Sequence, residues 1–134
     1  MRTGDAHRGF SSDGSDRCCD HGCMTDQYTF YPDLAAEATS VKRGIHSQTI
    51  SKGAGVEVLL FTLAPGEELS EHTSARPAIV HALRGTGQLT VAGDPHPLTP
   101  GAWLRMAAGT THAIVAESDL TFALYLLPRP EGVA

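Results

Sequence analysis

The sequence predicts an all-β protein folded as a single double-stranded β-helix, the jelly-roll barrel made of two sheets. Short apolar runs recur at regular spacing along the chain, and most of the 14 glycines and eight prolines lie between them. Short runs separated by glycine turns are typical of antiparallel strands in a barrel. The chain shows no amphipathic helix of useful length, so the core has to be built from strands.

The expected strands can be placed in order from residue 28 onward. They span residues 28–31, 41–50, 56–63, 77–83, 88–91, 103–106, 112–116 and 120–127, with a loop or helical turn at 32–39. Side chains alternate between the two faces of a strand, and residues 56–63 carry apolar side chains on both faces. This pattern indicates a strand that is buried on both sides. Glycine and proline favour turns at 65–66, 84–87 and 92–97, the last of which includes His96.

A single domain is expected to follow a disordered tail. The first 24 residues are rich in Gly, Ser, Asp and Arg and contain few large apolar side chains. Such a segment buries too little surface to offset its ordering entropy, so residues 1–27 are predicted to be a tail and residues 28–134 the barrel. A chain of 134 residues with 41% hydrophobic content can supply one sizeable core.

Charge and hydropathy exclude two classes of partner. The formal net charge is −5 and no Lys/Arg patch stands out, which argues against nucleic acid as a partner. No apolar stretch approaches the roughly 20 residues of a membrane helix. The N-terminal region also lacks the apolar run of a signal peptide, so we expect a cytoplasmic protein.

Two glycine-framed segments each carry one histidine at the end of a short expected strand. In the first, Gly66 precedes His72, and in the second, Gly101 and Gly109 precede His112. If the two strands lie side by side in the barrel, the two histidines meet inside it. Imidazole is the commonest metal ligand near neutral pH, so the pair is a candidate metal site.

These segments resemble the two conserved motifs of the cupin superfamily, in particular the small bacterial single-domain members. Gly66, His72 and Gly85 match the first motif, and Gly101, Gly109 and His112 match the second. The chain departs from the first motif at Ser74, where the family has a second His, and at Ala78, where it has Glu. In the second motif Ala107 replaces Pro and Ala116 replaces Asn. The resemblance implies the jelly-roll barrel, but it leaves only two of four usual metal ligands.

The resemblance implies Fe, Mn, Ni, Zn or Cu as the ion that His72 and His112 would hold. A metal site usually needs a third protein ligand, and His81 is the candidate. Side chains alternate along a strand, so an inward Ala78 turns His81 outward unless a bulge reverses the parity. The alternative is a pair of pocket histidines that hydrogen-bond to backbone or water.

Five further residues are candidates for a ligand pocket. Arg76 lies on the expected loop at the barrel mouth, where a guanidinium can hold a carboxylate or phosphate, although a solvated loop charge is the simpler alternative. Trp103, Met106, Phe61 and Phe122 are expected to form the core or the wall of the pocket.

The predicted tail contains three thiols and an imidazole within six residues: Cys18, Cys19, His21 and Cys23. Thiolates bind soft ions such as zinc or Cu(I). Adjacent cysteines cannot readily occupy two corners of a tetrahedral site, so we interpret this segment as a flexible tail with reactive thiols.

Three functions follow as hypotheses. The first is a barrel that binds a small molecule together with a divalent metal. The second is a metal-free ligand-binding or sensor module, and the third is a metal-trafficking or redox protein that uses the tail thiols. We also expect a homodimer, because Ile79, His81 and Leu83 and one apolar face of residues 120–127 leave more hydrophobic surface than a lone small barrel exposes.

Overall fold

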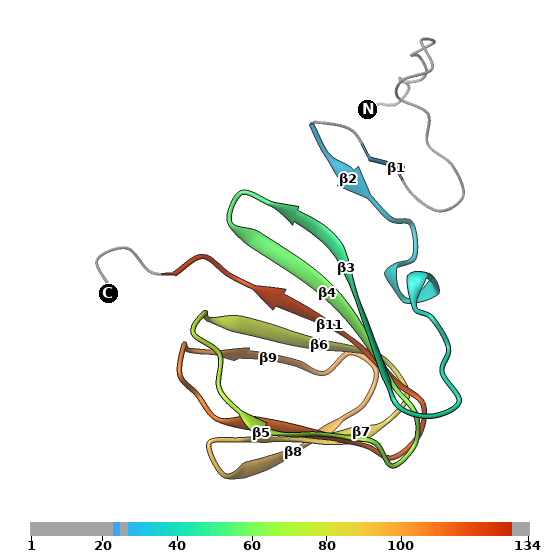
Figure 1. Cartoon of the computed structure of the whole chain (residues 1–134), viewed down its shortest axis with the longest axis vertical. Coiled ribbons are helices and arrows are strands. Elements are labelled where there is room, and N and C mark those ends of the chain that lie inside the picture. Colours follow the sequence, from blue (N-terminus) through green and yellow to red (C-terminus); the bar gives the residue numbers. More distant parts are fainter. Residues whose placement is uncertain (1–22, 25–26, 130–134) are drawn as a thin grey trace, which may run out of the picture. The chain divides into compact units, whose positions relative to one another are not determined.

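The structure is a computed structural model that describes residues 23–24 and 27–129 of the chain (Figure 1). The chain separates into two compact units, Met1–Leu34 and Ala35–Ala134. In the first unit β1 (Cys23–Met24) pairs antiparallel with β2 (Thr29–Phe30), inside the strand expected at 28–31. Most of the predicted tail lies outside the described residues, so its boundary at residue 27 stays a prediction.

Short strands joined by tight turns make up the second unit. After the 3-10 turn η2 (Leu34–Glu37), the strands are β3 (Ile45–Gly53), β4 (Val56–Leu63), β5 (Glu68–His72), β6 (Ala78–Arg84), β7 (Gly87–Val91), β8 (Asp94–Leu98), β9 (Trp103–Met106), β10 (His112–Ala116) and β11 (Leu120–Leu126). Within the described ranges no helix is long and apolar enough to cross a membrane.

These strands form two antiparallel sheets, which Figure 1 shows as separate layers. The five-stranded sheet has the order β3-β4-β11-β6-β9, and the four-stranded sheet has the order β5-β10-β7-β8. After β4 the chain passes back and forth between the sheets, so strands distant in sequence pair, such as β4 with β11. This is the predicted double-sheet jelly roll.

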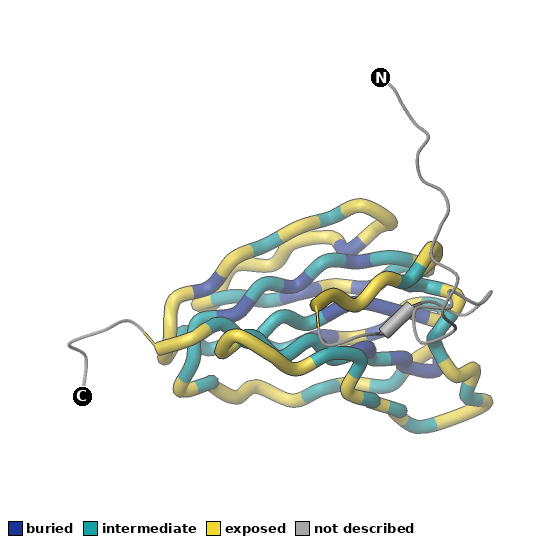
Figure 2. Tube along the Cα trace, turned by 90° about the horizontal axis from the view of Figure 1, so that it is seen from above, coloured by how far each residue is buried: buried dark blue, intermediate teal, exposed yellow. Residues whose placement is uncertain are grey.

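A core of buried apolar side chains fills the space between the two sheets. Its buried members are Leu63, Ala78, Val80, Ala82, Leu89, Leu98, Met106, Ile114, Ala116, Leu120 and Phe122. Strand β6 shows the underlying alternation, because Ala78, Val80 and Ala82 are buried while Ile79 and His81 are half-buried. Figure 2 shows buried residues interleaved with more exposed ones along several stretches of the chain.

Two strands differ from the prediction by more than one residue at an end or in kind. The strand expected at 41–50 begins only at Ile45, because Gly44 has a φ of 84° and bends the chain before the sheet starts. His96 was expected in a turn but lies in β8. Pro95 and Pro97 suggest a turn because proline lacks the backbone N–H. They are tolerated because β8 is the last strand of its sheet and pairs with another strand, β7, on one side only.

Candidate metal and ligand site

His72 and His112 lie directly opposite each other on neighbouring strands. His72 is the last residue of β5, His112 is the first residue of β10, and the register pairs their Cα atoms. Their ring centroids are 4.2 Å apart, and the ring planes make an angle of 60°. The fold therefore brings the two motif histidines into edge contact at one end of the four-stranded sheet.

The two rings are oriented by matching hydrogen bonds. Nδ1 of His72 is 2.7 Å from the carbonyl oxygen of Ser70, and Nδ1 of His112 is 3.0 Å from that of Thr110. A carbonyl oxygen can only accept, so Nδ1 carries the hydrogen in both rings. In the neutral imidazole the lone pair is then on Nε2, and within the described part of the chain neither Nε2 atom has a hydrogen-bond partner. Metal-binding histidines are usually held in this way.

The two imidazoles differ in exposure. His112 is only 7% exposed, whereas His72 is exposed and stands at the mouth. Burial lowers the pKa of His112 below its usual 6.5; the bond to Thr110 opposes this, and the like charge of His72 adds to the lowering. His112 is therefore neutral at pH 7, which is the form that binds a metal ion or accepts a hydrogen bond.

A small apolar cavity lies next to the histidine pair. Its volume is about 170 Å³, and its lining consists of Phe61, Leu69, His72, Val80, His112, Ile114, Phe122 and Leu124. The rings of Phe61 and Phe122 stack with centroids 5.0 Å apart and planes 3° from parallel. Among the described residues that line it, imidazole nitrogens are thus the only side-chain nitrogen or oxygen atoms.

Sequence reasoning identified only part of this cavity. Of the four predicted wall residues, Phe61 and Phe122 line it. The aliphatic lining was missed, although the alternation along β6 already places Val80 on the inner face. The other lining residues depend on which strands face each other across the barrel. The alternation of side chains within one strand does not contain that information.

Trp103 and Met106, which were expected in the core or the pocket wall, do not line this cavity. Trp103 is 60% exposed, and the register pairs it with His81 on the outer face. Met106 pairs with Ala78 and is buried in the core, but it does not line the cavity. Strand β9 is the last strand of its sheet, so its outward side chains have no neighbouring strand to cover them.

Arg76 does not serve as an anion clamp, because its guanidinium is bonded to the protein itself. Nε donates to the carbonyl of Leu127 at 2.9 Å, and Nη2 donates to the carbonyls of Gly55 at 2.6 Å and Leu126 at 3.0 Å. Nη1 forms an ion pair with Glu57 at 3.4 Å. The side chain therefore fastens the loop after β5 to the end of β11 and to the β3–β4 turn.

The described part of the chain supplies no third metal ligand near the pair. His81 projects from the outer face of β6, opposite to the inward Ala78, and it does not line the cavity. The Ser74 hydroxyl accepts a hydrogen bond from the Arg76 backbone N–H at 3.1 Å. In the described ranges no three His, Cys, Asp or Glu side chains gather as a metal site. Of the tail residues, Cys18, Cys19 and His21 lie outside the described residues, as does the Cys23 side chain.

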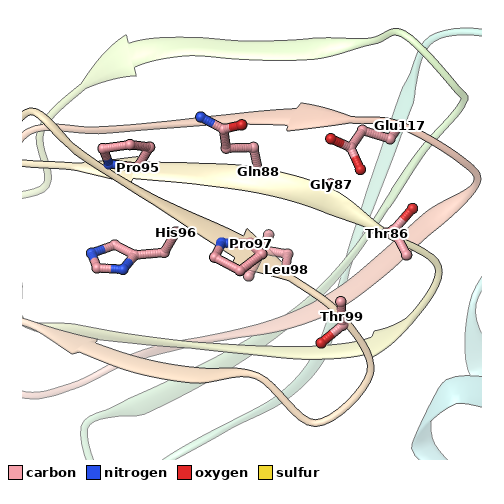
Figure 3. A pocket seen from close by; sticks show the side chains of 9 residues that line it. All are labelled: Thr86, Gly87, Gln88, Pro95, His96, Pro97, Leu98, Thr99 and Glu117. Atoms are coloured by element: carbon pink, nitrogen blue, oxygen red, sulfur yellow. The ribbon is translucent and has the colours of Figure 1, made fainter.

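A second hollow of about 260 Å³ lies along β7 and β8 (Figure 3). It shares no lining residue with the cavity beside the histidine pair. Figure 3 shows the imidazole of His96 and the carboxylate of Glu117 toward opposite ends of this hollow, and no ion pair joins them. The polar groups are spread along its rim and do not converge on one point.

Comparison with known proteins agrees with this architecture. A conserved protein of unknown function from Streptococcus pyogenes is 26% identical, with a TM-score of 0.66 over 75% of this chain and 87% of that chain. A cupin superfamily protein from Desulfitobacterium hafniense is 23% identical, with a TM-score of 0.66 over 71% and 87% of the two chains. A protein from Thermus thermophilus is 23% identical, with a TM-score of 0.66 over 73% and 96%.

The sequence itself also matches a family model. No curated protein matches the chain. Residues 59–127, from within β4 to just past β11, match the model of the cupin domain, and this stretch contains both histidine segments and every residue that lines the cavity. The chain belongs to the cupin family.

Proposed function

We propose that this cupin domain binds a small molecule in the cavity and holds a divalent transition-metal ion between Nε2 of His72 and Nε2 of His112. The matched bonds from Nδ1 to the carbonyls of Ser70 and Thr110 carry the proposal, because they leave both Nε2 lone pairs available at adjacent rings. Imidazole donors suit Zn, Cu, Fe and Ni better than Mn, Mg or Ca.

The donor set fits an ion that is held weakly and has open positions. Two imidazoles fill two coordination positions, and water or an oxygen of the cavity ligand fills the others. The bound ion would act as a Lewis acid toward such an oxygen. His72 stands at the mouth and His112 at the buried side, so the pair would place the ion between solvent and cavity.

Metal titration of purified protein tests this proposal. With Zn²⁺ or Ni²⁺ we expect one ion per chain, and either His72→Ala or His112→Ala is expected to weaken binding at least about tenfold. His96→Ala is the matched control, because this exposed histidine lies on β8, which β7 separates from β10, and it does not line the cavity. Equal affinity in wild type and both site variants would rule out the proposed metal site.

The pH dependence of the same titration provides a second measurement. Protons compete with the ion for imidazole, so affinity falls as the pH drops below ~6.5. Because burial lowers the pKa of His112, its protonation competes only at lower pH than that of an ordinary histidine. Metal affinity is therefore expected to be constant above neutral pH and to fall on the acid side.

The second candidate is a metal-free binding module, which the losses at Ser74 and Ala78 favour. Ala78 is buried at 2% exposure and offers no donor atom. A protein of this kind would bind its cavity ligand equally well before and after treatment with a chelator. The first proposal requires that added metal change the affinity for the ligand.

We also propose a homodimer formed through the outer face of the five-stranded sheet. Ile79 and His81 point away from the barrel interior, and the exposed Trp103 pairs with His81 on the neighbouring strand. A large exposed aromatic beside half-buried apolar side chains is typical of an interface. Sedimentation equilibrium should give a dimer at micromolar concentration, and Trp103→Ser should shift it toward monomer. A wild-type monomer throughout that range would refute the dimer.

A further inference from the structure

We propose that the ligand of the cavity is a neutral, single-ring molecule that carries one hydroxyl group, with the size and polarity of a phenol. The inference rests on the proposed function, because it names the ligand class of the same cavity. Four properties of the cavity lead to it: its volume, its apolar wall, the position of its acceptor atoms and the absence of a cation from its lining.

The volume limits the ligand to one ring. At about 170 Å³, the cavity is close in size to an apolar protein cavity of about 150 Å³ that binds benzene. A six-membered ring with one small substituent fills such a space. A fused two-ring molecule would leave part of its surface outside this space, at the mouth beside the exposed His72, and would lose contacts with the wall.

The wall selects an apolar and flat molecule. Phe61 and Phe122 present two nearly parallel stacked rings, and aliphatic side chains such as Val80 and Leu124 supply other parts of the lining. Aromatic and aliphatic surfaces offer dispersion contacts but no hydrogen bonds. Every polar group of the ligand must therefore be directed to one place.

That place is the histidine pair, which presents acceptors. Because both Nδ1 atoms donate to carbonyls, the neutral rings present Nε2 of His72 and of His112 as lone-pair donors. A ligand hydroxyl can donate its hydrogen to Nε2. If a metal ion occupies the pair, the oxygen of the same hydroxyl can take an open coordination position, so a hydroxyl group suits the pair with and without the ion.

Charge excludes carboxylates and phosphates. The cavity lining includes no Lys or Arg, and the guanidinium of Arg76 is engaged by three backbone carbonyls and Glu57. In the metal-free protein, an anion taken into this lining would lose its hydration without gaining a counter-charge. An ammonium group would meet the same cost, because no Asp or Glu lines the cavity.

The experiment compares four probes on the chelator-treated full chain, with binding followed by chemical-shift changes in NMR titrations. Phenol is expected to bind most tightly. Toluene has the same shape but no hydroxyl, and it should bind about tenfold more weakly. Benzoate and 2-naphthol should show no binding at the concentrations that saturate with phenol.

Two variants locate the binding. His112→Leu removes the buried acceptor and leaves only that of His72, so it should lower phenol affinity toward that of toluene, whereas His96→Ala should change nothing. Leu69→Trp fills the cavity from β5, where Leu69 is only half-buried, and should abolish binding of both phenol and toluene while the thermal unfolding midpoint stays near the wild-type value.

The outcomes separate this inference from the proposed function. Equal affinity for toluene and phenol, tighter binding of benzoate, or phenol binding that survives Leu69→Trp overturns the ligand class. If none of the probes binds but the metal titration succeeds, the ligand class is wrong and the metal site stands. If phenol binds as expected but no metal does, the ligand class stands and the metal site is wrong.

Discussion

Gly85→Ala is expected to destabilise the barrel by at least about 4 kcal/mol, a large fraction of the total stability of a domain of this size. Gly85 follows β6 and has a φ of 78°, a conformation that costs alanine about 1–2 kcal/mol. A Cβ at this position would also overlap the backbone carbonyl of Asp119, which leads into β11. Neither backbone can move without disturbing the pairing of Arg84 with Thr121. Urea unfolding followed by circular dichroism measures the loss.

Gly66→Ala is the matched control for this prediction. Gly66 has a similar φ of 85°, but a Cβ there would meet no atom within 4 Å. Its substitution should therefore cost only the backbone strain of about 1–2 kcal/mol. The difference between the two variants isolates the steric overlap at Asp119. If both lose the same stability, the turn relaxes around the new methyl group and the overlap argument is wrong.

These two glycines also explain why the family motif survives in a chain that has lost half of its usual ligands. Gly85 is required by the close approach of two chain segments, and Gly66 by the left-handed turn before β5. Both requirements concern the barrel and not the metal. Ligand positions such as Ala78 carry no such backbone demand, so they can change while the fold stays the same.

The local sequence pattern was sufficient to predict those strands that are plain apolar or alternating runs bounded by turn residues. Strands β4, β9 and β10 begin and end at the predicted residues, because each is an apolar or alternating run between turns. Strand β8 was missed because two prolines in five residues indicate a turn locally. The segment can form a strand because it lies at the edge of a sheet, and its position there depends on the whole fold.

The candidate site was predictable to the extent that it depends on strand ends. His72 ends β5 and His112 begins β10, and the antiparallel register brings these two strand ends together. Arg76 shows the limit of such reasoning. Its hydrogen-bond acceptors lie about 20 and 50 residues away in sequence, on Gly55 and on Leu126 and Leu127, so no local pattern reveals that its donors are already used.

Restoring the two lost ligands with Ser74→His and Ala78→Glu is expected to raise metal affinity at least about 100-fold, if each added ligand contributes tenfold or more. Ala78 is on the inner face of β6, two residues before the cavity-lining Val80. Ser74 lies on the loop that follows His72, and its carbonyl accepts a hydrogen bond from Gly109 N–H, three residues before His112. Both positions are thus close in the fold to the histidine pair, and titration with Zn²⁺ measures the gain.

The same variant should become dependent on metal for its stability. A glutamate at the buried position 78 brings a carboxylate into the core, which costs several kcal/mol unless an ion compensates the charge. The metal-free double variant should therefore melt below the wild type, and Zn²⁺ should raise its melting temperature more than that of the wild type. Ser74→His combined with Ala78→Gln is the control, because glutamine has nearly the same shape but is a poor ligand. A folded double variant with no gain over this control would mean that His72, His112 and position 78 do not face a common ion, and the metal site proposed for the natural chain would fail with it.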